Sequence, residues 1–407
     1  MPLAGFGDRH APFSGIDAPL EANAVAFRFD DTRCAVILTL DTLFAGPALH
    51  AALTEHFVRC HGQRADDLLV LASHTHFAPS IDDTKPALGW VDAAYAAFVV
   101  ASCEEVIDRV VASPGCPAIV ERRLGASDAA INRRRRWPLP HLDNRRLVGP
   151  QVCMAPNPNG PIDPTIDAWT ATDAAGKPVA LLWRYACHPT GFARPLHVSP
   201  DFPGVVRTRL RQHYGVTIPV MFLQGFAGDI RARVPEKRSL LRRTWHTLLT
   251  GPSFDGFTLA EWRDWAEALA GDVAAAFAGP PLPPAAEPQA VISLGSASCT
   301  VPLSRLVSGE ADDRPVRFQR LRVASMIDIV AVAAEPLTSL RGMIPFAGAT
   351  PVGYLGDAFG YWPTDRDARN GGYEVNHFLP AFGLHGRLQP SLDGVFRAAI
   401  DKLNQLH

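Results

Sequence analysis

The sequence predicts an α/β fold in which a mixed β-sheet core is flanked by helices. Short apolar runs of strand length alternate along the chain with longer segments whose apolar residues recur at helical spacing, and this alternation is typical of α/β proteins. The predicted strands are residues 24–29, 34–40, 68–72, 179–187, 219–223 and 326–333. The predicted helices are residues 46–60, 91–113, 202–213, 259–277 and 337–343.

Two segments indicate that the sheet contains antiparallel as well as parallel strands. Residues 169–179 have the pattern of a hairpin with its turn at 174–177, and residues 290–321 have the pattern of consecutive strands. Tight turns join antiparallel strands, whereas helical crossovers join parallel ones. A chain with both kinds of connection predicts a mixed sheet.

The best candidate for a domain boundary is the Pro-rich connector at 279–288. Glu335, which lies beyond this connector, follows an apolar strand as other polar residues before the connector do. We therefore predict that residues 1–407 form a single large catalytic domain.

Charge and composition argue against several classes of function. The 39 Lys and Arg residues balance 41 Asp and Glu residues, so no overall field favours nucleic acid or an anionic membrane. The chain has neither a signal-peptide pattern nor an apolar run near the roughly 20 residues of a membrane span, which predicts a cytoplasmic protein. Its seven cysteines are scattered singly, so neither a disulfide framework nor a thiolate zinc site is expected. Only four of the basic residues are Lys, a bias that suggests a GC-rich bacterial source.

Five of the apolar strands lead into residues that can ligate metals or transfer protons. In an open α/β sheet, ligands bind outside the carboxyl ends of the strands. The sequence therefore predicts one convergent site. The residues at these strand ends are Asp41, the pair His74 and His76, His188, Asp229 and Glu335.

The His74-Thr-His76 sequence is the strongest of these signals. On an extended segment the side-chain period is two, so both imidazoles are expected to face the same side. Imidazole nitrogen and carboxylate oxygen suit Zn²⁺, and a catalytic site keeps one coordination position for water or substrate. Two structural interpretations stay open, namely a histidine that only hydrogen-bonds the backbone and a buried carboxylate that caps a helix.

Seven short motifs in order, from residue 73 to residue 364, resemble the neutral ceramidase family, and a Tyr-Glu element at 371–374 follows them as a similar one does in the family. The seven motifs are SHTH at 73–76, INR at 131–133, ACHPT at 186–190, SPDFPG at 199–204, QGFAGDI at 224–230, AEP at 334–336 and YWPT at 361–364, and the Tyr-Glu element is GGYE at 371–374.

The resemblance implies a catalytic domain with one Zn²⁺ per chain and amide-bond cleavage by metal-activated water. By matching positions it implies four metal ligands and two further catalytic residues. His76 would polarise or protonate the scissile group, and Arg133 would contact a substrate oxygen. The implied ligands are His74, His188, Glu335 and Tyr361, with Tyr373 as the alternative tyrosine.

Three acidic residues have more than one interpretation. Asp229 is expected to orient a ligand or cap a helix, in the second coordination shell. Asp201 has the pattern of an N-cap for the helix that follows, and its nearness to His188 in the sequence keeps a role in the site open. Asp41 is a candidate for supporting a second metal ion.

Two departures from the family pattern argue against ceramide as the substrate. Arg231 occupies the position of a proposed catalytic Ser. The sequence also stops at His407, shortly after the metal-site motifs, so the immunoglobulin-like C-terminal domain of the ceramidases is not expected. Arg231, Arg233 and the run 133–136 also raise the option of an anionic substrate, because guanidinium groups bind carboxylate and phosphate well. Residues 134–136 are otherwise interpreted as partly a solvated loop.

The favoured function is zinc-dependent hydrolysis of the C–N bond in a small or medium-sized N-acyl amide, with an anionic group as an option. Two alternatives remain. One is a metal-dependent esterase or phosphoesterase, and the other is a non-catalytic relative that binds an anionic ligand. The sequence predicts no oligomeric state.

Overall fold

The computed structural model describes residues 1–407 except for 29–31, 144–145, 238–239, 284–293, 310–312 and 407. The first sheet has three strands. In it β2 (Ala22–Arg28) is antiparallel to β3 (Cys34–Leu40), which is parallel to β4 (Leu68–Ala72). Helix α1 (Gly46–His61) forms the crossover from β3 to β4, and the apolar side chains of α1 and α2 (Ala93–Ala112) pack against this sheet.

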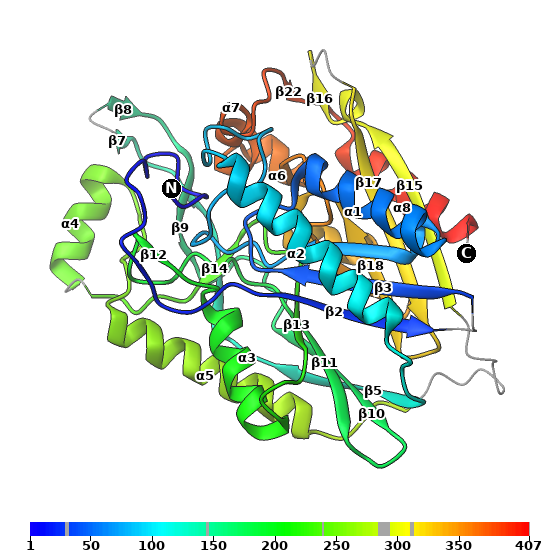
Figure 1. Ribbon diagram of the computed structural model, residues 1–407. Helices are drawn as coiled ribbons and strands as arrows, with labels where there is room; N and C mark the ends of the chain where they lie inside the picture. The colour runs from blue at the N-terminus through cyan, green and yellow to red at the C-terminus, as the bar shows by residue number, and fades with distance from the viewer. Residues whose placement is uncertain (29–31, 144–145, 238–239, 284–293, 310–312, 407) are drawn as a thin grey trace.

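The second sheet has the strand order β13-β11-β10-β5. The hairpin of β10 (Thr165–Asp173) and β11 (Pro178–Tyr185) confirms the predicted antiparallel turn. Strand β11 is parallel to β13 (Val220–Gln224), and the chain between them contains α3 (Phe202–Tyr214). Strand β10 is antiparallel to β5 (Ala118–Ala126). Helices α3 and α5 (Leu259–Ala278) lie against this sheet (Figure 1).

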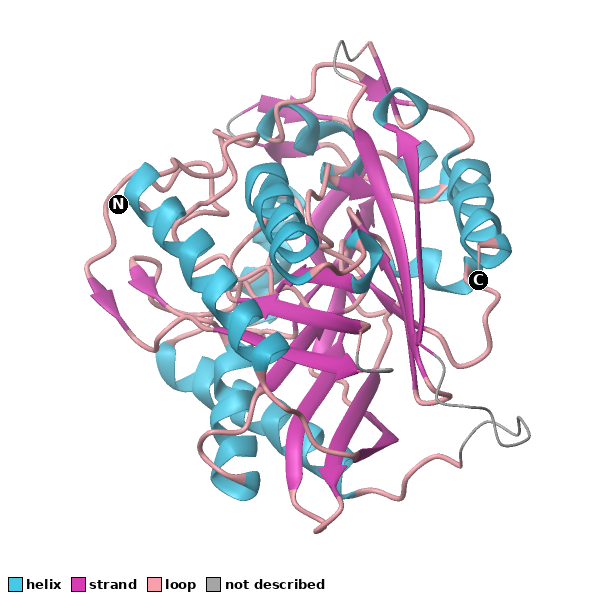
Figure 2. Cartoon of the chain, turned by 45° about the vertical axis from the view of Figure 1, so that its right-hand side comes forward, coloured by secondary structure: helices cyan, strands magenta, loops and turns pink. Residues whose placement is uncertain are grey.

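A third sheet has the order β15-β17-β18-β20. Strands β15 (Leu294–Pro302), β17 (Pro315–Val323) and β18 (Ile327–Val332) are antiparallel, and β20 (Thr350–Val352) joins β18 in parallel. Helix α8 (Leu392–Gln405) packs its apolar face against β15 and β17 (Figure 2). The predicted α/β fold with mixed sheets and flanking helices is confirmed.

A smaller sheet has β6 (Ala130–Trp137) between β14 (Ile230–Ala232) and β9 (Gln151–Asn157). The arginine run therefore lies in a strand, and the interpretation of residues 134–136 as a solvated loop is wrong for Arg134. This side chain is buried, and its charge is compensated by an ion pair with buried Glu374. Further along the run, Arg136 is exposed.

The remaining elements are short, apart from one helix of eleven residues. They are β1 (Gly15–Ile16) with β12 (His197–Val198), β7 (His141–Asp143) with β8 (Arg146–Val148), β16 (Val307–Ser308) with β22 (Arg387–Leu388), β19 (Glu335–Pro336) with β21 (Tyr361–Trp362), and the helices α4 (Leu240–Thr250), α6 (Asp365–Asn370), α7 (Phe378–Ala381), η1 (Ala65–Asp67), η2 (Leu303–Arg305), η3 (Thr338–Met343) and η4 (Tyr373–His377).

The predicted boundaries lie within two residues of the observed ones, but one predicted helix differs in type and several elements were not predicted. Residues 338–343 form the 3₁₀ helix η3 rather than an α-helix, and the unpredicted elements include the strands β5, β6 and β9 and the helices α4 and α8. The buried residues of α8 nevertheless repeat at helical spacing in the sequence. Much of the connector at 279–288 lies outside the described residues. Among the helices described, none has the length and apolar character needed to cross a bilayer.

Candidate metal centre

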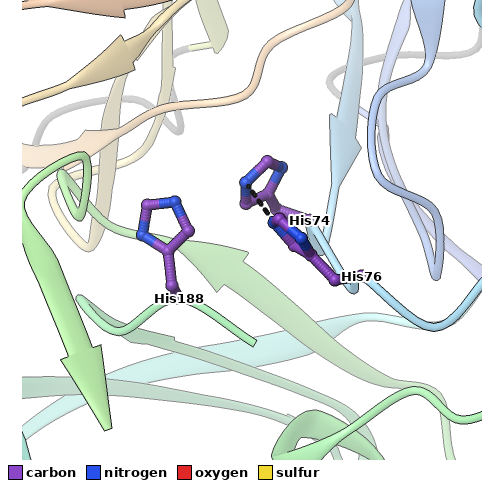
Figure 3. A group of neighbouring side chains, drawn as sticks. All are labelled: His74, His76 and His188. Atoms are coloured by element: carbon purple, nitrogen blue, oxygen red, sulfur yellow. Dashed lines mark hydrogen bonds between the residues drawn. The ribbon is translucent and has the colours of Figure 1, made fainter. Parts of the chain in front are cut away.

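Residues from four separate segments converge at the ends of the sheets. His74 follows β4 and His188 follows β11, while Glu335 in β19 pairs in register with Tyr361 in β21. Only 1% of the surface of His74, His188 and Glu335 is exposed. Figure 3 shows His74, His76 and His188 approaching one another from two different segments of the chain. The predicted convergence of strand ends is therefore present for these residues.

His74 and His76 meet for a different reason from the predicted one. Strand β4 ends at Ala72, and His74 has a φ of 65°, so the segment is not extended there and the period of two does not apply. The Nε2 atoms of His74 and His76 nevertheless lie 3.3 Å apart. A left-handed backbone is uncommon for a residue with a Cβ and marks a locally constrained turn.

The imidazole of His188 lies between acceptors at both of its nitrogens. Its Nδ1 is 2.6 Å from the carbonyl oxygen of Ala227 and 3.1 Å from that of Ile230, and its Nε2 is 3.0 Å from Glu335 Oε2. A neutral imidazole carries only one N–H. Burial, followed by the charge of Arg133, lowers the pKa of His188 to about 4, so the neutral form is favoured. One nitrogen lone pair therefore faces an oxygen.

His74 has the same arrangement. Its Nδ1 is 2.9 Å from the carbonyl oxygen of Leu43, and its Nε2 is 3.4 Å from the same Glu335 Oε2. If each Nδ1–H donates to a backbone carbonyl, both Nε2 lone pairs point toward one carboxylate oxygen. The negatively charged oxygen repels these two lone pairs. A cation bound by both Nε2 atoms and the carboxylate removes the repulsion, as in metal sites whose histidines are oriented by outer hydrogen bonds.

Glu335 supplies the third group that could bind a metal ion beside His74 and His188. Its Oε1 is buried and has no hydrogen-bond partner, which is rare for a native carboxylate. Burial acts to raise the pKa of Glu335, whereas protons on the facing nitrogens of His74 and His188 lower it well below its usual value. A cation in place of those protons keeps the carboxylate ionised in the same way. Two imidazole nitrogens and an ionised carboxylate with a free oxygen fit Zn²⁺.

Tyr361 lies beside this group and contacts Arg133. The Arg133 Nη2 donates to the Tyr361 hydroxyl at 3.0 Å, and the Tyr361 ring stacks with that of His188 at a centroid distance of 6.4 Å. Burial, reinforced by Glu335, raises the pKa of Tyr361 well above its usual value, while Arg133 opposes this rise. Tyr373, the alternative ligand, has its ring 5.7 Å from that of Tyr361.

A buried ion-pair network fixes Arg133. Glu374 accepts from Arg133 Nε at 2.8 Å through Oε1 and from Arg134 Nη1 at 2.6 Å through Oε2. Glu374 lies in the π-helix η4, an irregularity that is frequent at functional sites. The network joins β6 to a segment some 240 positions later, and it directs Arg133 toward Tyr361.

His76 is covered by the N-terminal segment. Its ring lies 4.9 Å from that of Phe6, its Nδ1 is buried without a partner, and its carbonyl oxygen accepts from Arg9. A Cβ at Gly5 would lie 2.3 Å from His76 Nδ1. Burial, followed by the charges of His74 and His188, lowers the pKa of His76 well below its usual value, so the ring is neutral.

The three acidic residues with open interpretations support the surrounding backbone. Asp229 accepts from Asn132 Nδ2 and from the Thr338 N–H, both at 2.8 Å. Asp201 is the N-cap of α3, and it also accepts from the Gly191 N–H and from Trp262.

Asp41 forms an ion pair of 2.7 Å with Arg207 and accepts from the Glu21 N–H. Two clusters of potential metal ligands occur among the described residues, and neither contains Asp41.

Some contributors to this site are not indicated by the sequence. The carbonyl groups of Leu43 and Ala227 carry no residue-type signal, because any amino acid could supply them. Tyr354 packs on His74 with a centroid distance of 4.3 Å, and its hydroxyl lies 3.5 Å from Glu335 Oε2. Glu374 belongs to the quoted GGYE motif, but its role depends on contacts across the whole chain.

The described fold is similar to two solved structures of ceramidases. The neutral ceramidase from Pseudomonas aeruginosa superposes with a TM-score of 0.71 and 14% identity, over 99% of this chain and 71% of that chain. A ceramidase complexed with C2 gives a TM-score of 0.72 and 14% identity, over 98% of this chain and 72% of that chain. No protein-family model matches the sequence, and no curated protein matches it. The chain therefore has a neutral ceramidase-like fold.

Proposed function

We propose that this chain is a zinc-dependent hydrolase that cleaves the C–N bond of an N-acyl amide. The observation that carries the proposal is the pair of buried imidazoles, His74 and His188, whose Nε2 atoms both face Glu335 Oε2 while their Nδ1 atoms face backbone carbonyls. Zinc would be held by these three residues and by Tyr361, whose hydroxyl accepts from Arg133.

When bound at such a site, zinc lowers the pKa of a bound water to about 7 and polarises a carbonyl group. The protein residues have separate roles in the proposal. Arg133 stabilises negative charge on the Tyr361 oxygen, which favours the form of tyrosine that binds metals. The neutral His76 accepts a proton during attack on the acyl carbon and returns it to the departing amine nitrogen.

Amide cleavage is proposed in preference to ester cleavage because the two structures of similar fold are ceramidases, whose substrate is an amide. The proposed substrate is small or medium-sized. We also propose that residues 1–407 act as one catalytic unit, since His74, His188 and Glu335 belong to segments that follow strands of three different sheets.

The test combines metal analysis with matched substrates. Purified metal-replete protein should contain about one zinc per chain and should hydrolyse an N-acyl amide in a reaction that a chelator abolishes and zinc restores. A matched ester with the same acyl chain serves as the comparison. Less than about a tenth of an equivalent of zinc, or chelator-sensitive cleavage of the ester alone, would contradict the proposal.

A further inference from the structure

A second cation lies beside the candidate metal centre. Arg231 in β14 pairs with Ile131 of β6, and it also forms an isolated parallel bridge with His188. Directly paired residues on neighbouring strands project to the same side, and such strands lie about 4.8 Å apart. The side chain of Arg231 therefore leaves the backbone one strand spacing from that of His188 and on the same side.

Arg231 forms no ion pair among the described residues. Its Nε is buried without a hydrogen bond, and its guanidinium carbon lies 5.0 Å from the ring centre of Phe254. Burial, followed by the charge of Arg133, lowers the pKa of Arg231 to about 10, which is consistent with two guanidinium groups near each other. The charge of Asp201 acts to raise this pKa, but the Asp201 oxygens already accept from the N–H groups of Gly191, Phe202 and Trp262. An aromatic ring holds the cation but does not neutralise it.

The side chains of the neighbouring arginines have hydrogen-bond acceptors, which the Arg231 side chain lacks among the described residues. Arg133 and Arg134 share the carboxylate of Glu374, and Arg233 donates to the carbonyl oxygens of Asp128 and Ala130. Buried or partly buried charges are normally paired, because an unpaired charge loses hydration without compensation. Arg231, which is bridged to His188, thus lacks an ion-paired counter-ion.

We propose that Arg231 binds a carboxylate of the substrate, and that the substrates of this protein are N-acyl amino acids. This inference depends on the proposed amide hydrolysis. In an N-acyl amino acid, the carboxylate carbon is two bonds from the scissile nitrogen, which matches a cation placed beside His188. In the reaction the C–N bond breaks, the water oxygen bonds to the acyl carbon, and the amine nitrogen takes the proton. The products are a carboxylic acid and a free amino acid.

Three substrates that share one octanoyl chain test the inference. They are N-octanoylglycine, the neutral N-octanoylethanolamine and the phosphorylated N-octanoyl-O-phosphoethanolamine. The wild-type kcat/KM should be about 10- to 100-fold higher for N-octanoylglycine than for the neutral amide, as expected for hydrogen bonds to a charged group. A preference for the phosphorylated amide, or no preference for an anion, would overturn the inference.

Variants assign the preference to Arg231. Arg231→Gln should reduce the ratio of the two kcat/KM values at least tenfold, whereas Arg231→Lys, which keeps the charge but loses the planar fork, should retain part of it. Arg233→Gln is the matched control and should keep the wild-type ratio. A structural defect lowers both rates and leaves the ratio unchanged, so an unchanged ratio in a folded Arg231→Gln protein contradicts the proposal. If that variant does not fold, the ratios of the wild type and Arg231→Lys decide.

A binding measurement separates this inference from the proposed function. Calorimetry with chelator-treated protein should give a dissociation constant for N-octanoylglycine at least tenfold lower in the wild type than in Arg231→Gln. If this difference is found although no amide is cleaved, the proposed function fails and the anion site stands. If amides are cleaved but neither the dissociation constant nor the kcat/KM ratio depends on Arg231, only the present inference fails.

Discussion

Two clusters of potential metal ligands occur among the described residues. They differ in whether the imidazole N–H groups suffice for the hydrogen-bond acceptors around them. The first consists of His74, His76 and His188, and the second of His56, His61 and Asp108. In both clusters, one potential ligand atom from each residue lies within 4.8 Å of the others. Proximity alone therefore does not distinguish the two clusters.

The second cluster, between α1 and α2, is explained by ordinary hydrogen bonds. His56 Nε2 and His61 Nε2 lie 2.6 and 2.7 Å from Asp108 Oδ1, and this carboxylate side chain is 50% exposed. One carboxylate oxygen can accept two donors, so two neutral imidazoles satisfy the geometry. In the first cluster, His74 and His188 have acceptors at both nitrogens. A metal site is indicated where acceptors outnumber protons.

The largest expected difference between the clusters is in metal content. His74→Ala should lose zinc and activity together, because only one imidazole nitrogen then remains beside Glu335 and Tyr361 to hold the ion. The matched variant His56→Ala should retain about one zinc per chain and near wild-type turnover. Zinc is measured by elemental analysis after dialysis. Loss of zinc in His56→Ala with retention in His74→Ala would reverse the comparison.

A His76 variant distinguishes a proton-transfer residue from a metal ligand. His76→Ala should lower kcat by about 10²- to 10⁴-fold, which is the usual contribution of a positioned acid–base group. The zinc content should stay near one equivalent, because His76 is proposed to transfer protons rather than to bind metal. Zinc analysis and kcat are measured on the same preparation. If zinc is lost, His76 is a ligand and the proposed four-ligand set is wrong.

The sequence predicts the strands of this site better than its contacts. Strands β3 and β4 follow from uninterrupted apolar runs, and His74, His188 and Glu335 follow from their positions at strand ends. The left-handed backbone of His74 and the carbonyl acceptors arise from tertiary packing, which has no local residue signature. The same holds for long-range pairing, since the partners of Glu374 lie some 240 positions away.

Charge burial around the two clusters should also differ. Glu374→Gln removes the anion shared by Arg133 and Arg134. It should lower the free energy of unfolding by about 3 kcal/mol, because breaking a buried ion pair leaves an uncompensated charge. In the second cluster, the Glu104 carboxylate lies 3.8 Å from His56 Nδ1. Glu104→Gln should lower the free energy of unfolding by less than about 1 kcal/mol, because this pair is partly exposed to solvent.

Urea denaturation of the chelator-treated proteins measures both changes without a contribution from zinc binding. Equal losses in the two variants would mean that the Glu374 network is no more coupled to stability than a surface pair.

The smallest expected effect is the pH dependence of stability that arises from the second cluster. Burial acts to raise the pKa of Asp108, but hydrogen bonds from His56 and His61 outweigh it and lower this pKa below its usual value. A carboxyl group with a lowered pKa in the folded state stabilises the protein above its unfolded pKa of about 3.9. That stabilisation is lost as the pH falls through the folded pKa. Because Asp108 is half exposed, the contribution should be less than about 1 kcal/mol.

Asp108→Asn tests this sign. As the pH falls from 6 into the acid range, the free energy of unfolding of the wild type should fall slightly more than that of the variant, and the two values should converge once the pH lies below the folded pKa of Asp108. Urea midpoints at several pH values measure the difference. The zinc content of the variant should equal that of the wild type, because two neutral imidazoles hydrogen-bonded to Asp108 have no unmatched acceptor for a cation to satisfy. A loss of zinc in Asp108→Asn would show that the second cluster also binds metal, although its acceptors all receive protons. The distinction between the two clusters would then fail.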